Sequence, residues 1–289
     1  LMPPVVTGAG VAVIGLNLAG IPIKNMAASN FDSWMQLVTF VCVALVAVFT
    51  RGMVQRLLIL VGLLLATLIY LLLANGMGLG KPMDFSGIVN APWLGWPKFT
   101  APVFDAGAML LIAPVALILV AENLGHIKAV QAMTGRNLDP YIGRAFIGDG
   151  IATMVSGAAG GTGVTTYAEN IGVMAATRIY STAVFVVAAL MALLLGFSPK
   201  FGAFIQAIPL PVMGGVSIVV FGLITIAGAK IWVDNKVDFT DPANLLTAAI
   251  TLVLGTGDFT LKFGSFALGG IGTATFGAVL LHALLRRRT

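Results

Sequence analysis

The sequence predicts an all-α polytopic membrane protein, and three observations carry this prediction. Of its 289 residues, 58% are hydrophobic and only 9% are charged, which is far from the composition of a soluble domain. The mean hydropathy is +1.01. Apolar runs of about 20 residues, the length that a helix needs to cross the hydrocarbon core, recur along the whole chain.

Seven of these runs are strong, and others are diluted by Gly, Thr and charged residues, so we expect about ten passes. The strong segments are 5–23, 34–50, 57–74, 106–126, 180–196, 211–229 and 266–285, and the weaker ones are 142–158, 165–179 and 242–256. A link over 75–105 separates the first three segments from the other seven. Its tryptophans, Trp93 and Trp96, suit a membrane interface, so we expect an external loop and a domain boundary there.

The distribution of basic residues predicts the orientation, because cytoplasmic loops carry an excess of Lys and Arg. If the segments alternate from a cytoplasmic loop at Arg51 and Arg56, eleven basic residues lie inside and five outside, and the C-terminus is cytoplasmic. The inside set is Arg51, Arg56, Lys128, Arg136, Arg144, Arg178, Lys230, Lys236, Arg286, Arg287 and Arg288, and the outside set is Lys24, Lys81, Lys98, Lys200 and Lys262.

Composition also limits the function. The single Cys42 excludes a disulfide framework, and the scattered basic residues form no face for nucleic acid in spite of a pI near 9.6. No nucleophile and base, and no metal-ligating set, can be assembled, so we expect neither an enzyme nor a cofactor. The chain starts at Leu1 without a signal peptide, and we expect it to be N-terminally truncated.

The two glutamates are the most informative charged residues, because both interrupt apolar membrane sequence. A charge at bilayer depth costs roughly 2.5–3.5 kcal/mol on insertion scales, so such residues usually face a cavity and bind a ligand or an ion. Glu122 and Glu169 are each followed by Asn and, after one more residue, by Gly. An isolated Glu could instead snorkel to the interface, but the repeated pattern favours function.

His126 follows Glu122 by four residues, so the two side chains would share one face of a helix and could share a proton. A membrane histidine can also be a hydrogen-bonded packing residue. The other histidine, His282, lies near the C-terminus, so a metal site is not expected.

Residues 157–167 read GAAGGTGVTTY, which predicts a break in a helix near the middle of the membrane. The glycines free the backbone, Thr165, Thr166 and Tyr167 favour an extended chain, and a helix resumes near Ala168. Extended backbone at that depth survives only where protein covers it or where it lines a cavity. Broken helices of this kind form substrate sites in many transporters, although small-residue helix packing would explain the glycines as well.

These features suit a flat, neutral imide or lactam, whose N–H groups would meet the carboxylates and whose carbonyls would meet backbone N–H groups. An anion does not fit, because the base nearest Glu169 is Arg178, about 13.5 Å away along a helix.

The stretch Glu169-Asn170-Ile171-Gly172-Val173-Met174-Ala175-Ala176-Thr177-Arg178 resembles the signature of the nucleobase-ascorbate transporters, which is Gln, Glu or Pro, then Asn-x-Gly, four variable residues, Thr and a base. The resemblance continues through 121–126 and 208–215, covers essentially the whole chain and is nearest to the bacterial uracil and pyrimidine permeases. It implies fourteen membrane segments in two inverted seven-segment repeats, with a core and a gate domain.

On this pattern, 1–75 would be the last three segments of the first repeat and part of the gate, 76–105 an external loop, and 106–289 the second repeat. Within that repeat, about 106–179 and 211–232 would belong to the core, and about 180–196 and 240–289 to the gate. The first four segments would precede this chain. The resemblance also implies a broken helix with a short strand near 160–170, a homodimer, and the cell inner membrane as the location.

The resemblance further assigns roles to residues. It implies that Glu122, Glu169, Tyr167 and the backbone N–H of Ala168 bind the substrate and that His126 acts with Glu122 in proton coupling. Position 168 is Gly in the best-known uracil permease, so its methyl group would narrow the pocket. The residues that support the motif are Asn123, Thr166, Asn170, Gly172, Thr177 and Arg178.

Together these patterns predict proton-coupled uptake of uracil or a related pyrimidine by alternating access, with a nucleobase, protons and the lipid bilayer as partners. A xanthine or purine permease of the same family is the nearest alternative, but purine transporters tend to carry Gln at position 169 and Asp at position 126. An anion transporter of the sulfate permease type would need a base at the ligand, and a structural membrane subunit would leave both glutamates unexplained.

Overall fold

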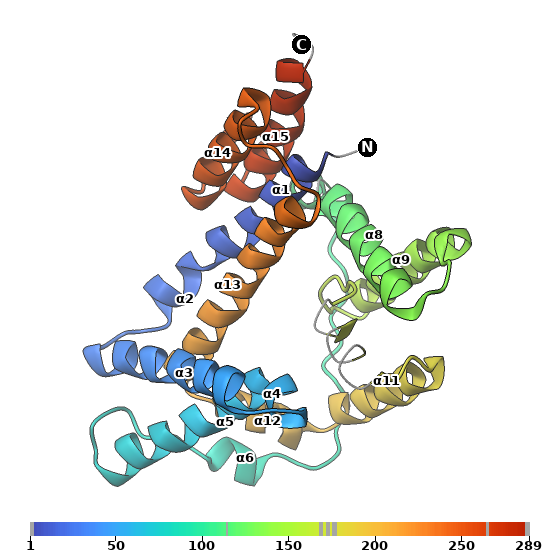
Figure 1. Cartoon of the computed structure of the whole chain (residues 1–289). Helices are drawn as coiled ribbons and strands as arrows, with labels where there is room; N and C mark the ends of the chain where they lie inside the picture. Colours follow the sequence, from blue (N-terminus) through green and yellow to red (C-terminus); the bar gives the residue numbers. More distant parts are fainter. Residues whose placement is uncertain are drawn as a thin grey trace. The chain divides into compact units, whose positions relative to one another are not determined.

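The computed structural model describes residues 3–113, 115–167, 170–171, 174, 178–263 and 266–286, and most of these are helical (Figure 1). The helices are α1 (Pro4–Leu18), α2 (Gly20–Asn25), α3 (Asn30–Phe49), α4 (Met53–Arg56), α5 (Leu58–Leu71), α6 (Ser86–Asn90), α7 (Ala106–Ile112), α8 (Val115–Thr134), α9 (Ile142–Ala158), α11 (Thr182–Gly196), α12 (Pro199–Gln206), α13 (Leu210–Asp234), α14 (Pro242–Thr256) and α15 (Gly270–Arg286). A π-helical turn (Leu72–Gly76) extends α5, and a 3-10 turn (Asp139–Tyr141) precedes α9.

Several predicted segments coincide with helices. Segments 142–158 and 242–256 match α9 and α14 residue for residue. Among the described residues, four helical stretches are long and apolar enough to cross a membrane, and a fifth would do so if α11 and α12, bent by 85°, form one span. The four are Pro4–Asn25, Asn30–Phe49, Leu58–Gly76 and Leu210–Asp234. This confirms a helical protein with several apolar spans.

Other predictions need correction. Segment 106–126 is not one helix but the two helices α7 and α8, the second of which runs on to Thr134. The described residues 161–167 contain no paired strand; the strands β1 (Leu261–Phe263) and β2 (Phe266–Leu268) form an antiparallel hairpin before α15 instead. The apolar pattern missed that hairpin because strand and helix residues there are equally apolar.

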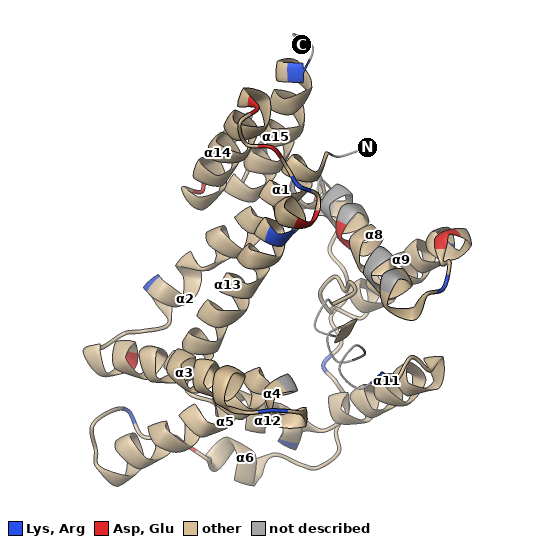
Figure 2. Cartoon of the chain, viewed as in Figure 1, with Lys and Arg blue, Asp and Glu red and all other residues tan. Residues whose placement is uncertain are grey.

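Charged residues are sparse along the helices, as Figure 2 shows, and the sequences of α5 and α11 contain none. Every residue of α11 is exposed, although the helix is built almost wholly from Ala, Val, Leu and Phe. Polar residues cap the starts of several helices: Ser29 and Asp32 form a capping box on α3, and Asp241 caps α14 just before a proline. This distribution is the one expected where lipid surrounds the helices.

The contacts divide the chain into two units. The first comprises Leu1–Ala28, Phe104–Ala121 and Gly214–Thr289. Its centre is α1 packed against α14 and α15, and the indole of Trp232 on α13 donates to the carbonyl of Val5 at 3.1 Å. Asp258 accepts from the amide of Gly270 at 2.9 Å and so joins the ends of the β1–β2 hairpin.

The second unit comprises Ser29–Val103 and Glu122–Met213. In it α3 packs on α5 around the buried residues Met35, Ala66 and Tyr70, and the Tyr70 hydroxyl donates to the carbonyl of Lys81 at 2.9 Å. The corner between α11 and α12 is held by Lys200, whose ammonium donates to the carbonyl of Ile88 at 2.9 Å. The same unit contains the greater part of the predicted site.

Candidate functional site

The described part of the predicted site lies where α8, α9 and the non-helical residues 161–167 meet (Figure 1). The sequence predicts an extended chain here, and we call these residues the extended segment. Helix α8 places Asn123 and His126 on one side, three residues apart, which is about one turn. Glu122, one residue before Asn123, is half-buried.

Asn123 connects the three elements. It is only 4% exposed, and its side-chain Nδ2 donates to Oδ2 of Asp149 on α9 at 2.8 Å. Its Oδ1 accepts from the hydroxyl of Thr165 at 3.3 Å and from the hydroxyl of Thr166. A buried amide whose oxygen and nitrogen both have partners is a strong positional constraint, since any lost partner leaves a desolvated polar group.

His126 reaches the same segment. Its Nδ1 lies 2.7 Å from Oγ1 of Thr166, which is hydrogen-bond distance. The sequence led us to expect Glu122 as a partner of His126, which stays a prediction; the structure adds this contact with Thr166. The histidine and the extended segment are thus physically joined.

Helix α9 anchors the other side of this segment. The Thr153 hydroxyl donates to the carbonyl of Val164 at 2.8 Å, and the Ser156 hydroxyl donates to the carbonyl of Thr162 at 2.6 Å. Gly160, with φ of +82°, turns the chain back, and a Cβ there would lie 2.7 Å from the carbonyl oxygen of Thr100. Side chains therefore satisfy backbone groups that a helix break leaves open.

We expect Thr153→Val to loosen this segment. The substitution keeps the shape of the side chain but removes the bond to the Val164 carbonyl, which lowers the local stability by about 1 kcal/mol. Amide hydrogen exchange of 161–167 should then be about fivefold faster. Thr153→Ser, which keeps the hydroxyl, is the control, and equal exchange in both variants would contradict the anchoring role.

The structure describes only some of the other predicted site residues. Tyr167 is 62% exposed, and Asn170 and Arg178 are also exposed, with a positive φ of 56° at Arg178. Ala168, Glu169, Gly172 and Thr177 lie outside the described residues. Helical geometry is present at the described positions 170, 171 and 174, as expected for the half-helix after the break.

Sequence reasoning missed Asp149. Nine of the eleven acidic residues are Asp, and most occupy loops and helix ends, so this one did not stand out. It lies inside the weak membrane segment 142–158, in the run Ile147-Gly148-Asp149-Gly150-Ile151. A carboxylate inside a predicted membrane segment is the same signal that identified the glutamates.

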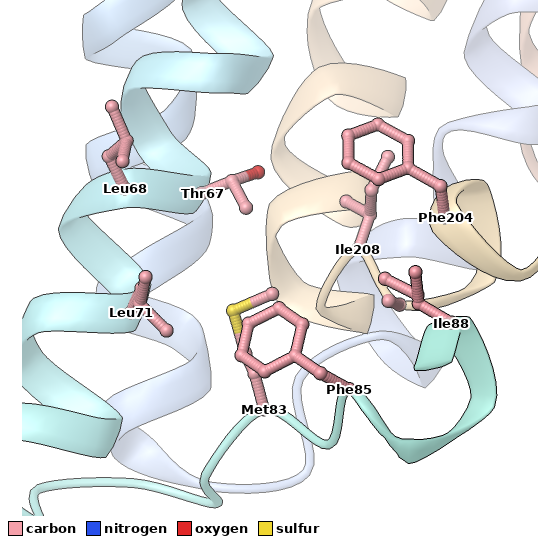
Figure 3. A pocket seen from close by; sticks show the side chains of 9 residues that line it. Thr67, Leu68, Leu71, Met83, Phe85, Ile88, Phe204 and Ile208 are labelled. Carbon is pink, nitrogen blue, oxygen red and sulfur yellow. The ribbon is translucent and has the colours of Figure 1, made fainter. Parts of the chain in front are cut away.

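A separate apolar pocket of about 90 Å³ lies within the second unit between α5, α6 and α12 (Figure 3). Its lining contains a single side-chain hydroxyl and no charged group, so it offers little to a polar ring. The residues that line it are Thr67, Leu68, Leu71, Met83, Phe85, Ile88, Phe204, Ala207 and Ile208. In the described parts of the chain, no group of three or more His, Cys, Asp and Glu side chains could hold a metal ion.

Comparison with known proteins adds to this geometry. Residues 1–263 match a family model described as a permease family, Xan_ur_permease. The chain is 66% identical over 288 residues to the putative pyrimidine permease RutG of Escherichia coli K12, covering 100% of this chain and 65% of that protein. It is 38% identical over 304 residues to a uracil permease of Bacillus caldolyticus, covering 100% of this chain and 68% of the relative.

A uracil permease of Escherichia coli K12 is 36% identical over 296 residues, which covers 99% of this chain and 67% of the relative. The chain thus spans about two thirds of the length of the curated relatives that it matches. These relatives bear the names of permeases and not of enzymes.

Proposed function

Because this chain belongs to the permease family of nucleobase-ascorbate transporters, we propose that the protein takes up uracil or a related pyrimidine across the cytoplasmic membrane together with protons. The observation that carries the proposal is that the segment 161–167 is held between α8 and α9 by hydrogen bonds with the buried Asn123 and with the partly exposed Thr153. The names of the relatives point to the same class of substrate.

Recognition of the ring rests on hydrogen bonds. A pyrimidine of this type carries N–H donors and carbonyl acceptors around a flat ring. In the proposed site, Glu122 on α8 and Glu169 after the break accept from its N–H groups, and the backbone N–H of Ala168 donates to a carbonyl. Tyr167 packs against the ring face. Charge-assisted bonds of this kind are about twice as strong as neutral ones, which gives selectivity for a substrate with donors in these positions.

Proton coupling is assigned to His126 with Glu122. The ordinary pKa range of a histidine allows its charge to change near neutral pH. His126 contacts Thr166 on the substrate segment, so gain of a proton on the ring alters the hydrogen bonds of the element that binds the nucleobase. This link supports coupling between the proton and the substrate.

Transport proceeds in this proposal by alternating access in a repeat fold with core and gate domains. The core is formed by about 106–179 and 211–232, and the gate by 1–75, about 180–196 and about 240–289, with 76–105 as the external loop. The relatives are longer than this chain, which spans about two thirds of their length, and the rest of the first repeat is proposed to lie outside residues 1–289. A homodimer with cytoplasmic C-termini completes the proposed arrangement.

Uptake of radiolabelled uracil tests the proposal directly. The full-length protein is expressed in cells that lack their own uracil uptake, and uptake is measured with and without a protonophore. We expect uracil to accumulate and the protonophore to abolish accumulation. Uptake that persists after the proton gradient is collapsed would contradict proton coupling, and absence of any uptake would contradict the substrate.

A purine permease is the second candidate, because the matching family name covers xanthine as well as uracil. Competition distinguishes the two: excess unlabelled uracil should suppress uptake of the label, whereas excess xanthine should leave it nearly unchanged. Suppression by xanthine at equal concentration would favour the purine function.

A further inference from the structure

The hydrogen bonds around Asn123 have a direction that Asp149 determines. An ionised carboxylate only accepts hydrogen bonds, so the side-chain group that faces Asp149 must be the Nδ2 of Asn123, 2.8 Å away. If the amide were turned over, its oxygen would face the carboxylate and leave two acceptors in repulsive contact without a proton. The Oδ1 of Asn123 therefore points toward the extended segment.

That orientation determines what Thr166 can do. The Oδ1 of Asn123 has two lone pairs, and these accept from the hydroxyls of Thr165 and Thr166. A threonine hydroxyl has one proton, so Thr166 has already used its donor on Asn123. Toward His126, 2.7 Å away, the Thr166 oxygen can therefore only accept.

The proton of this last bond must then belong to His126. Its Nδ1 donates to Thr166 both when the ring is neutral and when it is charged, because the imidazolium also has a proton on Nδ1. The two charge states differ only at Nε2. The chain of bonds thus selects one neutral tautomer and one titrating nitrogen out of two.

We propose that Asp149 is a positioning residue which, through Asn123 and Thr166, keeps the His126 proton on Nδ1 and makes Nε2 the atom that takes up and releases a proton. This rests on the proposed function of His126 in proton coupling. No contact between Asp149 and His126 is required. Asp149 on α9 sets the orientation of the Asn123 amide, which determines the donor of Thr166 and so the protonated nitrogen of His126 on α8.

Histidine ¹⁵N NMR of the full-length protein in lipid nanodiscs tests the assignment at a pH where the ring is neutral. His126→Asn identifies the two nitrogen signals of this ring by their loss. In the parent protein we expect Nδ1 at the shift of a protonated nitrogen and Nε2 at the shift of an unprotonated one. The opposite pattern in the parent protein would overturn the proposal.

Asp149→Asn removes the acceptor-only group, since an amide at position 149 can face Asn123 with either its oxygen or its nitrogen. We expect the His126 ring to show both tautomers and uracil uptake to fall about tenfold. The double variant Asn123→Asp with Asp149→Asn swaps the amide and the carboxylate between the two positions. The carboxylate then stands at position 123, where it still accepts from the Thr166 hydroxyl. This double variant should restore the Nδ1 proton and most of the uptake.

Thr166→Val removes the hydroxyl at the other end of this series of hydrogen bonds, and it provides a second test if the Asp149 variant does not fold. We expect Thr166→Val to give both His126 tautomers and Thr166→Ser, which keeps the hydroxyl, to give only one. A His126 ring that keeps only the Nδ1 proton in Asp149→Asn would overturn the proposal. Mixed tautomers of His126 in the double variant Asn123→Asp with Asp149→Asn would overturn it as well. If the tautomers respond as expected in a protein that takes up no uracil, the positioning role stands and the proposed function fails.

Discussion

Glu169→Gln is expected to reduce uracil uptake by about 10- to 150-fold, because the change removes a charge-assisted hydrogen bond worth about 1.5–3 kcal/mol. Gln has the same size as Glu, so packing is preserved while the full negative charge on the acceptor is lost. Glu169 lies outside the described residues, and its proposed role rests on its place in the motif. The measurement is the initial rate of radiolabelled uracil uptake over a range of concentrations.

Asp234→Asn at the exposed end of α13 is the matched control, since it also removes one carboxylate charge. Its uptake should equal that of the parent protein at equal expression. If the Glu169 variant and this control behave alike, the carboxylate at position 169 does not bind the substrate. A binding measurement by thermal shift with uracil separates loss of binding from loss of a later transport step.

Gly228→Leu is expected to have the largest effect on stability. Gly228 on α13 approaches α1 so closely that a Cβ would lie 2.5 Å from the amide nitrogen of Ala12 and 2.6 Å from the carbonyl oxygen of Gly8. These atoms are backbone and cannot swing away, so the helices must separate. Such close packing of small residues is how helices associate in lipid, where the hydrophobic effect between helices is absent.

Overpacking of this kind costs about 1–3 kcal/mol and can cost more where backbone is displaced. The thermal unfolding of purified protein should therefore shift to a markedly lower temperature, or the variant should fail to yield a monodisperse peak. Gly222→Leu on the same helix is the control, because a Cβ at Gly222 meets nothing within 4 Å. Equal stability of the two variants would show that the approach of α1 to Gly228 is not needed for folding.

Much of the helical structure could be predicted because the signals are local. Segments 142–158 and 242–256 carry their own boundaries in the sequence: Asp241-Pro242 starts one helix, and Ala158 precedes a run of glycines that ends the other. The prediction was wrong over 106–126, where the apolar run continues through the point at which α7 ends. Hydropathy reports transfer into lipid and does not report where a helix stops.

In the candidate site, too, sequence spacing predicts some relations between residues and not others. Residues on one helix, such as Glu122 and His126, could be related from their spacing alone. The role of Asp149 could not, because its partner Asn123 lies 26 residues earlier on a different helix. Nothing in a single sequence indicates which two polar residues of separate helices will meet.

By itself the sequence determined the membrane class, the positions of most helices, the break before Glu169 and the family, because each depends on composition or on residues near in the chain. Only the tertiary structure decided that Asn123 joins α8, α9 and the extended segment and that His126 contacts Thr166. The physical reason is that a buried polar group must find partners wherever the fold brings them, and those partners follow from packing and not from sequence spacing.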